Sequence, residues 1–169
     1  MTINKNSNAS SASQLSIYVQ NVRSLGVQIN SNKFTRPIDQ GCDIYIFVDA
    51  RVNEPKMRQL WANFKVRMSN FQTYNTNSQH RGILILCKKA SGCKIENCVT
   101  VDTDSTVIFD LIPPDGDPIN CAAVYGPSKD VPSYWEIVDR ELSQRKSPFK
   151  CIAGDFNTTL NFARDTTGY

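Results

Sequence analysis

Phe149-Lys150-Cys151-Ile152-Ala153-Gly154-Asp155-Phe156-Asn157 has the composition of a buried β-strand that ends in an acid and an amide. Its apolar residues can be packed away from water, and Gly154 allows another backbone to approach closely. Asp155 and Asn157 are two positions apart, so in an extended chain their side chains point the same way. Such a pair at a strand's carboxyl end fits a phosphate or metal site in an α/β protein. Polar residues at strand ends are also common turn formers, so this stretch alone leaves both interpretations open.

The chain has 169 residues, enough for one ordinary domain with a substantial core. Hydrophobic residues make up 40% and charged residues 21%, values close to the average for globular proteins. The sequence has no apolar run long enough to span a membrane, and its N-terminus lacks the apolar core of a signal peptide. We therefore expect no membrane partner. The net charge of +3 permits a polyanionic partner without requiring one.

Six cysteines could suggest disulfides, but this is not a short, loop-rich secreted chain. Cys87, Cys121 and Cys151 lie inside apolar runs, where a free thiol behaves as a small hydrophobe. His80 is the only histidine, so the sequence does not indicate a zinc site. These observations predict a reduced, intracellular protein.

Apolar runs and turn residues divide the chain into strands and helices. Residues 1–14 have little to bury, and we expect a disordered leader followed by one domain over 15–169. Alternating or continuous apolar residues predict further strands at 15–20, 42–48, 71–74, 82–87, 94–102, 107–112 and 119–125. The last two are expected to form an antiparallel hairpin, because a turn sequence separates them.

Helices are predicted in three places. A short one follows the first strand, where Pro37 interrupts it. Asn53 can cap a second, and Ser133 with Glu136 matches the capping box of a third that runs to about Arg145. Because helices precede two of the most apolar strands, we expect a layered α/β fold with mixed sheets. One helical stripe, interpreted as core packing, consists of Met57, Leu60, Trp61 and Phe64.

Four predicted strands end in polar residues, which suggests that their ends converge on one rim of the sheets. Asn21 and Asp49 are oxygen donors of the kind that Mg²⁺ (or Mn²⁺) takes together with substrate phosphate and water. Asp155 can orient or deprotonate a water molecule. Asn157 and Tyr125 can hydrogen-bond the phosphoryl oxygens where charge builds up. These residue types predict phosphodiester cleavage assisted by a hard cation.

Five short motifs, in chain order between residues 21 and 157, resemble those of the endonuclease/exonuclease/phosphatase superfamily. That superfamily includes abasic-site endonucleases and pancreatic-type DNases. The wording Asn-Val-Arg-Ser-Leu at 21–25 most resembles the endonuclease domain of non-LTR (LINE-type) retrotransposons, as does the tail from Thr158 to Asp165. The resemblance runs from about Leu15 to Tyr169. Its motifs are residues 21–25, the strand ending at Asp49, and residues 82–85, 124–128 and 154–157.

The resemblance implies a four-layered α/β sandwich with two packed mixed β-sheets. It implies a nuclear enzyme that nicks DNA with Mg²⁺ or Mn²⁺, and as partner the remainder of a longer retroelement polyprotein. It also implies roles for single residues. Asn21 and Asp49 would hold the metal, and Tyr125 would hydrogen-bond the phosphate region. Asp155 would position or activate the attacking water, and Asn157 would support the site and its transition-state charge. Arg23 would contact the DNA backbone.

The sequence departs from the family pattern in two respects. The family's metal acid is normally Glu in a Gln-Glu-Thr setting, whereas Asp49 would place its carboxylate roughly 1.5 Å further back. Mg²⁺ demands tight geometry, so a water would fill the gap or affinity would fall. The C-terminal Asp and His motif is missing, and losing such a group lowers the rate on the order of 10²–10⁴-fold. We therefore expect a C-terminally incomplete domain with an exposed sheet edge, inactive or impaired as this chain.

Several functions stay open at this point. The first is a Mg²⁺-dependent DNA endonuclease domain. The second is a non-catalytic relative that binds nucleic acid or a protein, including a second chain paired with the exposed edge. The third is a phosphatase or lipid phosphodiesterase of the same superfamily. In the fourth interpretation, the polar strand ends are only turn residues.

Overall fold

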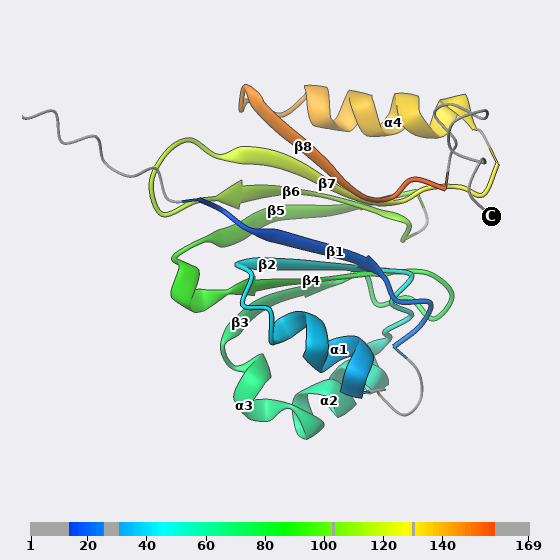
Figure 1. Ribbon diagram of the computed structural model, residues 1–169. Coiled ribbons are helices and arrows are strands. Elements are labelled where there is room, and N and C mark those ends of the chain that lie inside the picture. Colours follow the sequence, from blue (N-terminus) through cyan, green and yellow to red (C-terminus); the bar gives the residue numbers. More distant parts are fainter. Residues whose placement is uncertain (1–13, 26–30, 103, 130, 158–169) are drawn as a thin grey trace, which may run out of the picture.

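The computed structural model describes residues 14–25, 31–102, 104–129 and 131–157. In these ranges two four-stranded sheets pack face to face, and helices cover the outer face of each sheet (Figure 1). The result is the four-layered α/β sandwich with two mixed sheets that was expected. Except for Gln14, the predicted leader lies outside the described residues, as does the tail from 158 to 169.

The first sheet has the strand order β1-β2-β4-β3. Strand β1 runs parallel to β2, whereas β4 is antiparallel to both of its neighbours. Every residue of β2 is buried, as its nearly continuous apolar sequence predicted. The strands are β1 (Ile17–Asn21), β2 (Ile44–Val48), β3 (Phe71–Asn75) and β4 (Ile83–Lys88).

The second sheet has the order β5-β6-β7-β8. Strands β6 and β7 form the predicted antiparallel hairpin, and β8 adds to β7 in parallel. The strands are β5 (Lys94–Val101), β6 (Thr106–Ile112), β7 (Ile119–Tyr125) and β8 (Phe149–Asp155).

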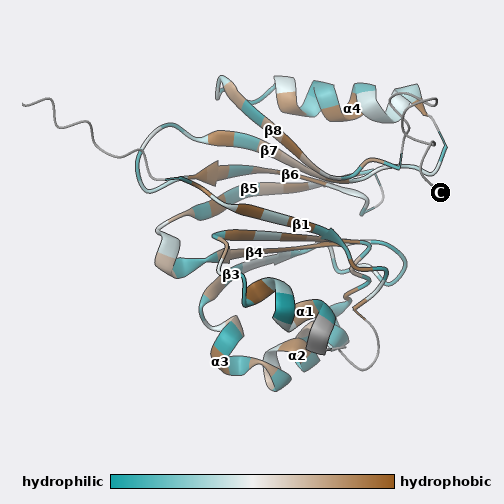
Figure 2. Ribbon diagram, viewed as in Figure 1, coloured by the Kyte–Doolittle hydropathy of each residue, from teal (hydrophilic) through white to brown (hydrophobic). Residues whose placement is uncertain are grey.

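Three apolar clusters hold the layers together. In Figure 2, where hydrophobic residues are brown, such residues run along the strands of both sheets. One cluster joins the two sheets, one joins the first sheet to α1–α3, and one joins the second sheet to α4. Trp61 departs from the predicted helical stripe, because 36% of it is exposed. The helices are α1 (Ser31–Ile38), α2 (Glu54–Asn63), α3 (Lys65–Met68), the 3₁₀ turn η1 (Lys89–Ser91) and α4 (Pro132–Ser143).

The two capping predictions have opposite outcomes. Asn53 caps α2, since its side-chain oxygen accepts a hydrogen bond from the Lys56 N–H at 3.2 Å. The capping box at Ser133 is wrong, because α4 begins at Pro132 and no side chain caps it. Proline fits the first helical turn, where its missing N–H would have no intrahelical acceptor.

Strands β1 and β8 bring the two sheets together at the candidate site. Each is the outermost strand of its sheet, each runs parallel to its neighbour, and the two contact each other. Their carboxyl ends therefore meet at one end of the sandwich (Figure 1). No helix in the described ranges is long and apolar enough to cross a membrane.

Candidate functional site

A hydrogen bond between the two sheets marks the centre of the candidate site. The side-chain nitrogen of Asn21, the last residue of β1, donates to Oδ2 of Asp155, the last residue of β8, at 2.7 Å. The two residues are 134 positions apart in sequence, so the contact is a product of the tertiary fold. The structure thus joins an amide and a carboxylate that the sequence placed at separate strand ends.

The other carboxylate oxygen of Asp155 organises the turn that follows β8. Oδ1 accepts a hydrogen bond from the Asn157 N–H at 3.0 Å. Asn157 has φ +47°, and its side-chain nitrogen donates to the carbonyl of Gly126 at 2.9 Å. Asparagine tolerates this left-handed conformation better than most residues. Because a carboxylate has about four acceptor positions, Asp155 can still accept from a water molecule or a substrate hydroxyl.

The ends of β7 and β8 approach each other so closely that two glycines are needed. A Cβ on Gly154 would lie 1.9 Å from the carbonyl oxygen of Val124. A Cβ on Gly126 would lie 2.1 Å from the carbonyl oxygen of Phe156. The close approach expected at Gly154 is confirmed, whereas the need for glycine at 126 was not foreseen. These contacts fix Asp155 beside the end of β7.

Tyr125 lies at that end of β7, in register with Asp155. Its N–H donates to the carbonyl of Ser105 at 2.7 Å, which anchors the strand end to the start of β6. The guanidinium carbon of Arg81 lies 6.0 Å from the centre of the Tyr125 ring, at the outer limit of a cation–π contact. The phenol is half-buried and lies next to a cation that the sequence analysis did not single out.

Asp49, the predicted metal carboxylate, is already bound to an arginine. Arg51 Nε donates to Asp49 Oδ1 at 2.8 Å, and Arg51 Nη2 donates to Asp49 Oδ2 at 3.0 Å. The Asp49 side chain is only 3% exposed, whereas that of Arg51 is 43% exposed. The Asp49 carboxylate raises the pKa of Arg51, through its hydrogen bonds first and its charge second. Arg51 was not among the residues expected at the site, although the sequence contains an Asp-x-Arg pattern directly after a buried strand.

The backbone after β2 holds this ion pair at the rim. Asp49 and Arg51 have φ values of +52° and +53°. The Arg51 N–H donates to the carbonyl of Arg81 at 2.7 Å, and the Asp49 carbonyl accepts from the Ser24 N–H at 2.7 Å. The segment is therefore tied both to the residues after β1 and to those before β4. Two non-glycine residues in the left-handed region persist only where the surroundings hold them, as they do here.

The remaining candidates lie nearby or on the surface. Arg23 is exposed, and its N–H donates to Oδ1 of Asn21 at 2.9 Å. Its predicted contact with DNA stays a prediction. His80 is exposed, as expected for a surface residue. The five residues at strand ends thus lie at one rim of the sandwich, while their individual roles stay predictions.

The donor atoms of the rim do not fit a divalent cation in the arrangement that the structure shows. Oxygen donors suit Mg²⁺. Both carboxylate oxygens of Asp49 are nevertheless engaged by the Arg51 guanidinium, which would repel a second cation. Within the described ranges, no group of three or more His, Cys, Asp or Glu side chains could hold a metal ion.

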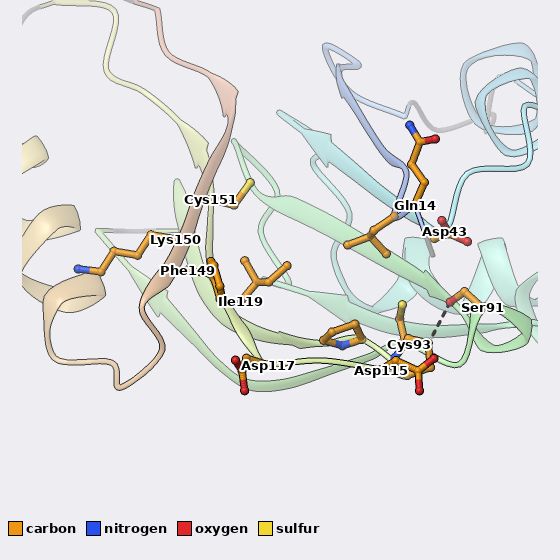
Figure 3. Close-up of a pocket in the computed structure, with 13 residues that line it drawn as sticks. Gln14, Asp43, Ser91, Cys93, Asp115, Asp117, Ile119, Phe149, Lys150 and Cys151 are labelled. Carbon is orange, nitrogen blue, oxygen red and sulfur yellow. Dashed lines mark hydrogen bonds between the residues drawn. The ribbon is translucent and has the colours of Figure 1, made fainter. Parts of the chain in front are cut away.

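A cavity of about 570 Å³ lies at the opposite end of the sandwich (Figure 3). Phe149 and Cys151 from β8 face it, together with Asp43, which immediately precedes β2, and Cys93, which lies in the connection between β4 and β5. Phe149 precedes Asp155 by six residues, which is about 20 Å along a strand. The cavity is therefore separate from the candidate site.

No family model matches the sequence, and no curated protein matches it. Solved structures do share its fold. TDP2 from D. rerio, complexed with a single-strand DNA product, is 15% identical with a TM-score of 0.64 over 88% of this chain and 62% of that chain. The 3′ phosphatase NExo from Neisseria, bound to a product DNA hairpin, is 15% identical in sequence with a TM-score of 0.62. The match covers 89% of this chain and 60% of the NExo chain.

A third structure is the AP endonuclease LMAP from Leishmania major, which is 12% identical in sequence with a TM-score of 0.56. The match covers 83% of this chain and 54% of the LMAP chain. At such identities the likeness shows a common fold. The described chain spans 62% of the TDP2 chain and 60% of the NExo chain, so it corresponds to part of those proteins.

Proposed function

We propose that the carboxyl ends of β1, β2, β7 and β8 form a site that binds and hydrolyses phosphate esters of DNA. The proposal assigns the chain to the endonuclease/exonuclease/phosphatase superfamily. The observation that carries it is the Asn21–Asp155 hydrogen bond, which joins two motif residues across the sheets. The fold likeness to nucleases and phosphatases, two of them holding DNA products, supports the same class of function.

The roles follow from the atoms that are available. Asp155 orients or deprotonates the attacking water, because its carboxylate is held by Asn21 and by the Asn157 N–H and keeps free acceptor capacity. Tyr125 and Asn157 lie beside it and stabilise charge on the phosphoryl oxygens. Arg23 contacts the DNA backbone from the surface.

The finer proposal is DNA nicking of the retrotransposon type, with the rest of a longer retroelement polyprotein as partner. Mg²⁺ or Mn²⁺ is the cofactor that the resemblance implies, with Asn21 and Asp49 as its expected ligands. Because Arg51 occupies both oxygens of Asp49, no step of the proposed chemistry is assigned to that ion.

Plasmid nicking tests the proposal most directly. The chain is incubated with supercoiled DNA in buffers containing Mg²⁺, Mn²⁺ or EDTA, and the same assay is run on Asp155→Asn. We expect the variant to lower the rate by about 10²-fold or more, because it removes the group that activates water. Asp139→Asn, an exposed change on α4, serves as a matched control and should leave the rate unchanged. Equal rates in wild type and Asp155→Asn would contradict the hydrolytic role.

A second candidate function is a non-catalytic DNA-binding module, and the Asp49–Arg51 ion pair favours it. DNA binding without any Asp155-dependent cleavage would support this alternative. A chain that neither binds nor cleaves DNA would refute both. The outer edges of β1 and β8 are also where a second polypeptide could add strands.

A further inference from the structure

We infer that the Arg51 guanidinium occupies the position beside Asp49 where a divalent metal would be expected. In that position it binds a nucleic-acid phosphate directly. The inference deepens the proposed function and rests on it, because it assumes that the rim receives a phosphate ester. It makes one new claim, namely that phosphate binding at this rim needs no divalent cation.

The ion pair has the geometry of a permanent element of the site. Two parallel N–H···O bonds of 2.8 and 3.0 Å join the guanidinium to the carboxylate of Asp49. A bidentate arginine–carboxylate pair is stronger and more directional than a single contact. Asp49 is almost completely buried, so its charge needs a partner that stays in place. The guanidinium supplies that partner within the same loop.

Arg51 retains donors for a ligand. A guanidinium has five N–H groups, and the two bonds to Asp49 use two of them. The side chain is 43% exposed, so part of the group faces solvent. Arginine recognises phosphate through pairs of such donors. The same side chain can therefore neutralise Asp49 on one edge and bind a phosphate oxygen on another.

Further cations surround this loop. Lys56 Nζ donates to the carbonyl of Arg51 at 2.9 Å. Arg81, whose carbonyl accepts the Arg51 N–H, is exposed and places its guanidinium over the Tyr125 ring. Three cationic side chains thus lie at the rim against the carboxylates of Asp49 and Asp155. This balance favours an anionic ligand and disfavours a divalent cation.

The experiment compares the wild-type chain with Arg51→Gln in two assays. The first measures the anisotropy of a fluorescein-labelled 12-nucleotide single-stranded DNA, in EDTA and in Mg²⁺. The second measures Mn²⁺ binding by electron paramagnetic resonance. The matched control is Arg58→Gln, which removes an exposed arginine that pairs with Glu54 on α2.

We expect wild-type DNA affinity to be equal in EDTA and in Mg²⁺ within about twofold. Arg51→Gln should weaken binding in EDTA about tenfold, the value of one charge-assisted contact. It should also gain Mn²⁺ affinity, because Asp49 loses its partner; a merely structural arginine would not produce this gain. Arg58→Gln should change neither quantity. Arg51→Lys keeps the charge without the bidentate fork, and we expect an intermediate DNA affinity from it.

Four results would overturn the inference, the last of them only where Arg51→Gln does not fold. Wild-type binding that requires Mg²⁺ would refute it and leave the proposed function intact. Absence of DNA binding in both buffers would refute the proposed function as well. Equal Mn²⁺ affinity in wild type and in a folded Arg51→Gln, with folding checked by circular dichroism, would show that Arg51 does not occupy the cation position. If Arg51→Gln does not fold, Arg51→Lys decides, and unchanged DNA affinity in that variant contradicts the role of the fork.

Discussion

Asn21 and Asp155 share a 2.7 Å hydrogen bond that connects the last residues of two strands in different sheets. The bond links the geometry of the candidate site to the packing of the sandwich, because it forms only when both edge strands are in place. A change at Asn21 should therefore affect stability as well as chemistry.

Asn21→Asp replaces the donor with a second carboxylate against Asp155. We expect a loss of about 2–3 kcal/mol in the free energy of unfolding at neutral pH, from the missing hydrogen bond and the like-charge repulsion. Urea denaturation measures the loss. Gln59→Glu, an exposed neutral-to-acid change on α2, should cost less than about 0.5 kcal/mol. A similar loss in both variants would show that the Asn21–Asp155 contact is not specific.

Gly154→Ala inserts a Cβ that would lie 1.9 Å from the Val124 carbonyl oxygen. The obstacle is backbone, which cannot rotate away, so β7 and β8 must separate at the site. We expect destabilisation of about 3 kcal/mol or more. In Gly116→Ala the new Cβ meets nothing within 4 Å, so the only cost is the strain of an alanine at positive φ. We expect it to lower the free energy of unfolding by about 1–2 kcal/mol. Thermal unfolding of the two variants separates these effects, and equal melting temperatures would contradict the close approach.

Asp110 gives the stability of the fold a specific dependence on acid. Burial alone would raise the pKa of Asp110, but hydrogen bonds from Asn97, Arg145 and Asn120 and the charge of Arg145 lower it below its ordinary value of 3.8. A depressed folded-state pKa means that the stabilisation is complete above about pH 4–5 and is lost as the pH falls through the folded-state pKa.

Asp110→Asn should therefore lower stability at pH 7, by roughly 1.5–3 kcal/mol for bonds to a charged group. The difference from wild type should shrink as the pH falls below 3.8, the ordinary value. Urea denaturation between pH 7 and pH 3 measures both. Asp39→Asn, at an exposed pair with Arg67, provides the control. A difference that stays constant with pH would refute the assignment.

The stacked rings of Trp135 and Phe156 tie the turn after β8 to α4. Their centres lie 5.7 Å apart with an interplanar angle of 22°. Phe156→Ala should cost about 1 kcal/mol beyond the lost burial and should loosen the turn that holds Asn157. Faster amide exchange at Asn157 with an unchanged rate at buried Ile85 would check this. Unchanged exchange at both would show that the stack does not support the turn.

The sequence predicted the strands well because their apolar runs are long and their turns are marked. The predicted β6–β7 hairpin is present, and the opening stretch forms β8, which pairs in parallel with β7 and ends at the candidate site. The capping box at Ser133 failed because Pro132 could begin the helix one residue earlier without a side-chain cap. Such competition between two local signals is decided by packing.

The Asp49–Arg51 ion pair could not be predicted from residue types alone. It depends on left-handed backbone at both residues, and that backbone is held by the carbonyl of Arg81 and by the Ser24 N–H, which come from other parts of the chain. The sequence suggested a metal carboxylate at Asp49, whereas tertiary contacts placed a guanidinium on it. Positive φ at non-glycine residues is the type of feature that an apolar pattern does not reveal.

The contact between β1 and β8 also determines when the site can exist during synthesis. All four strands of the first sheet leave the ribosome before any strand of the second, so Asn21 is made 134 residues before its partner. Contacts of such sequence separation form late and slowly. A nascent chain would therefore carry a complete first sheet whose inner apolar face stays uncovered until β5, β6 and β7 emerge, and such an exposed face is prone to aggregation during that interval. The rim that is proposed to hold DNA can be assembled only after β8 has been made.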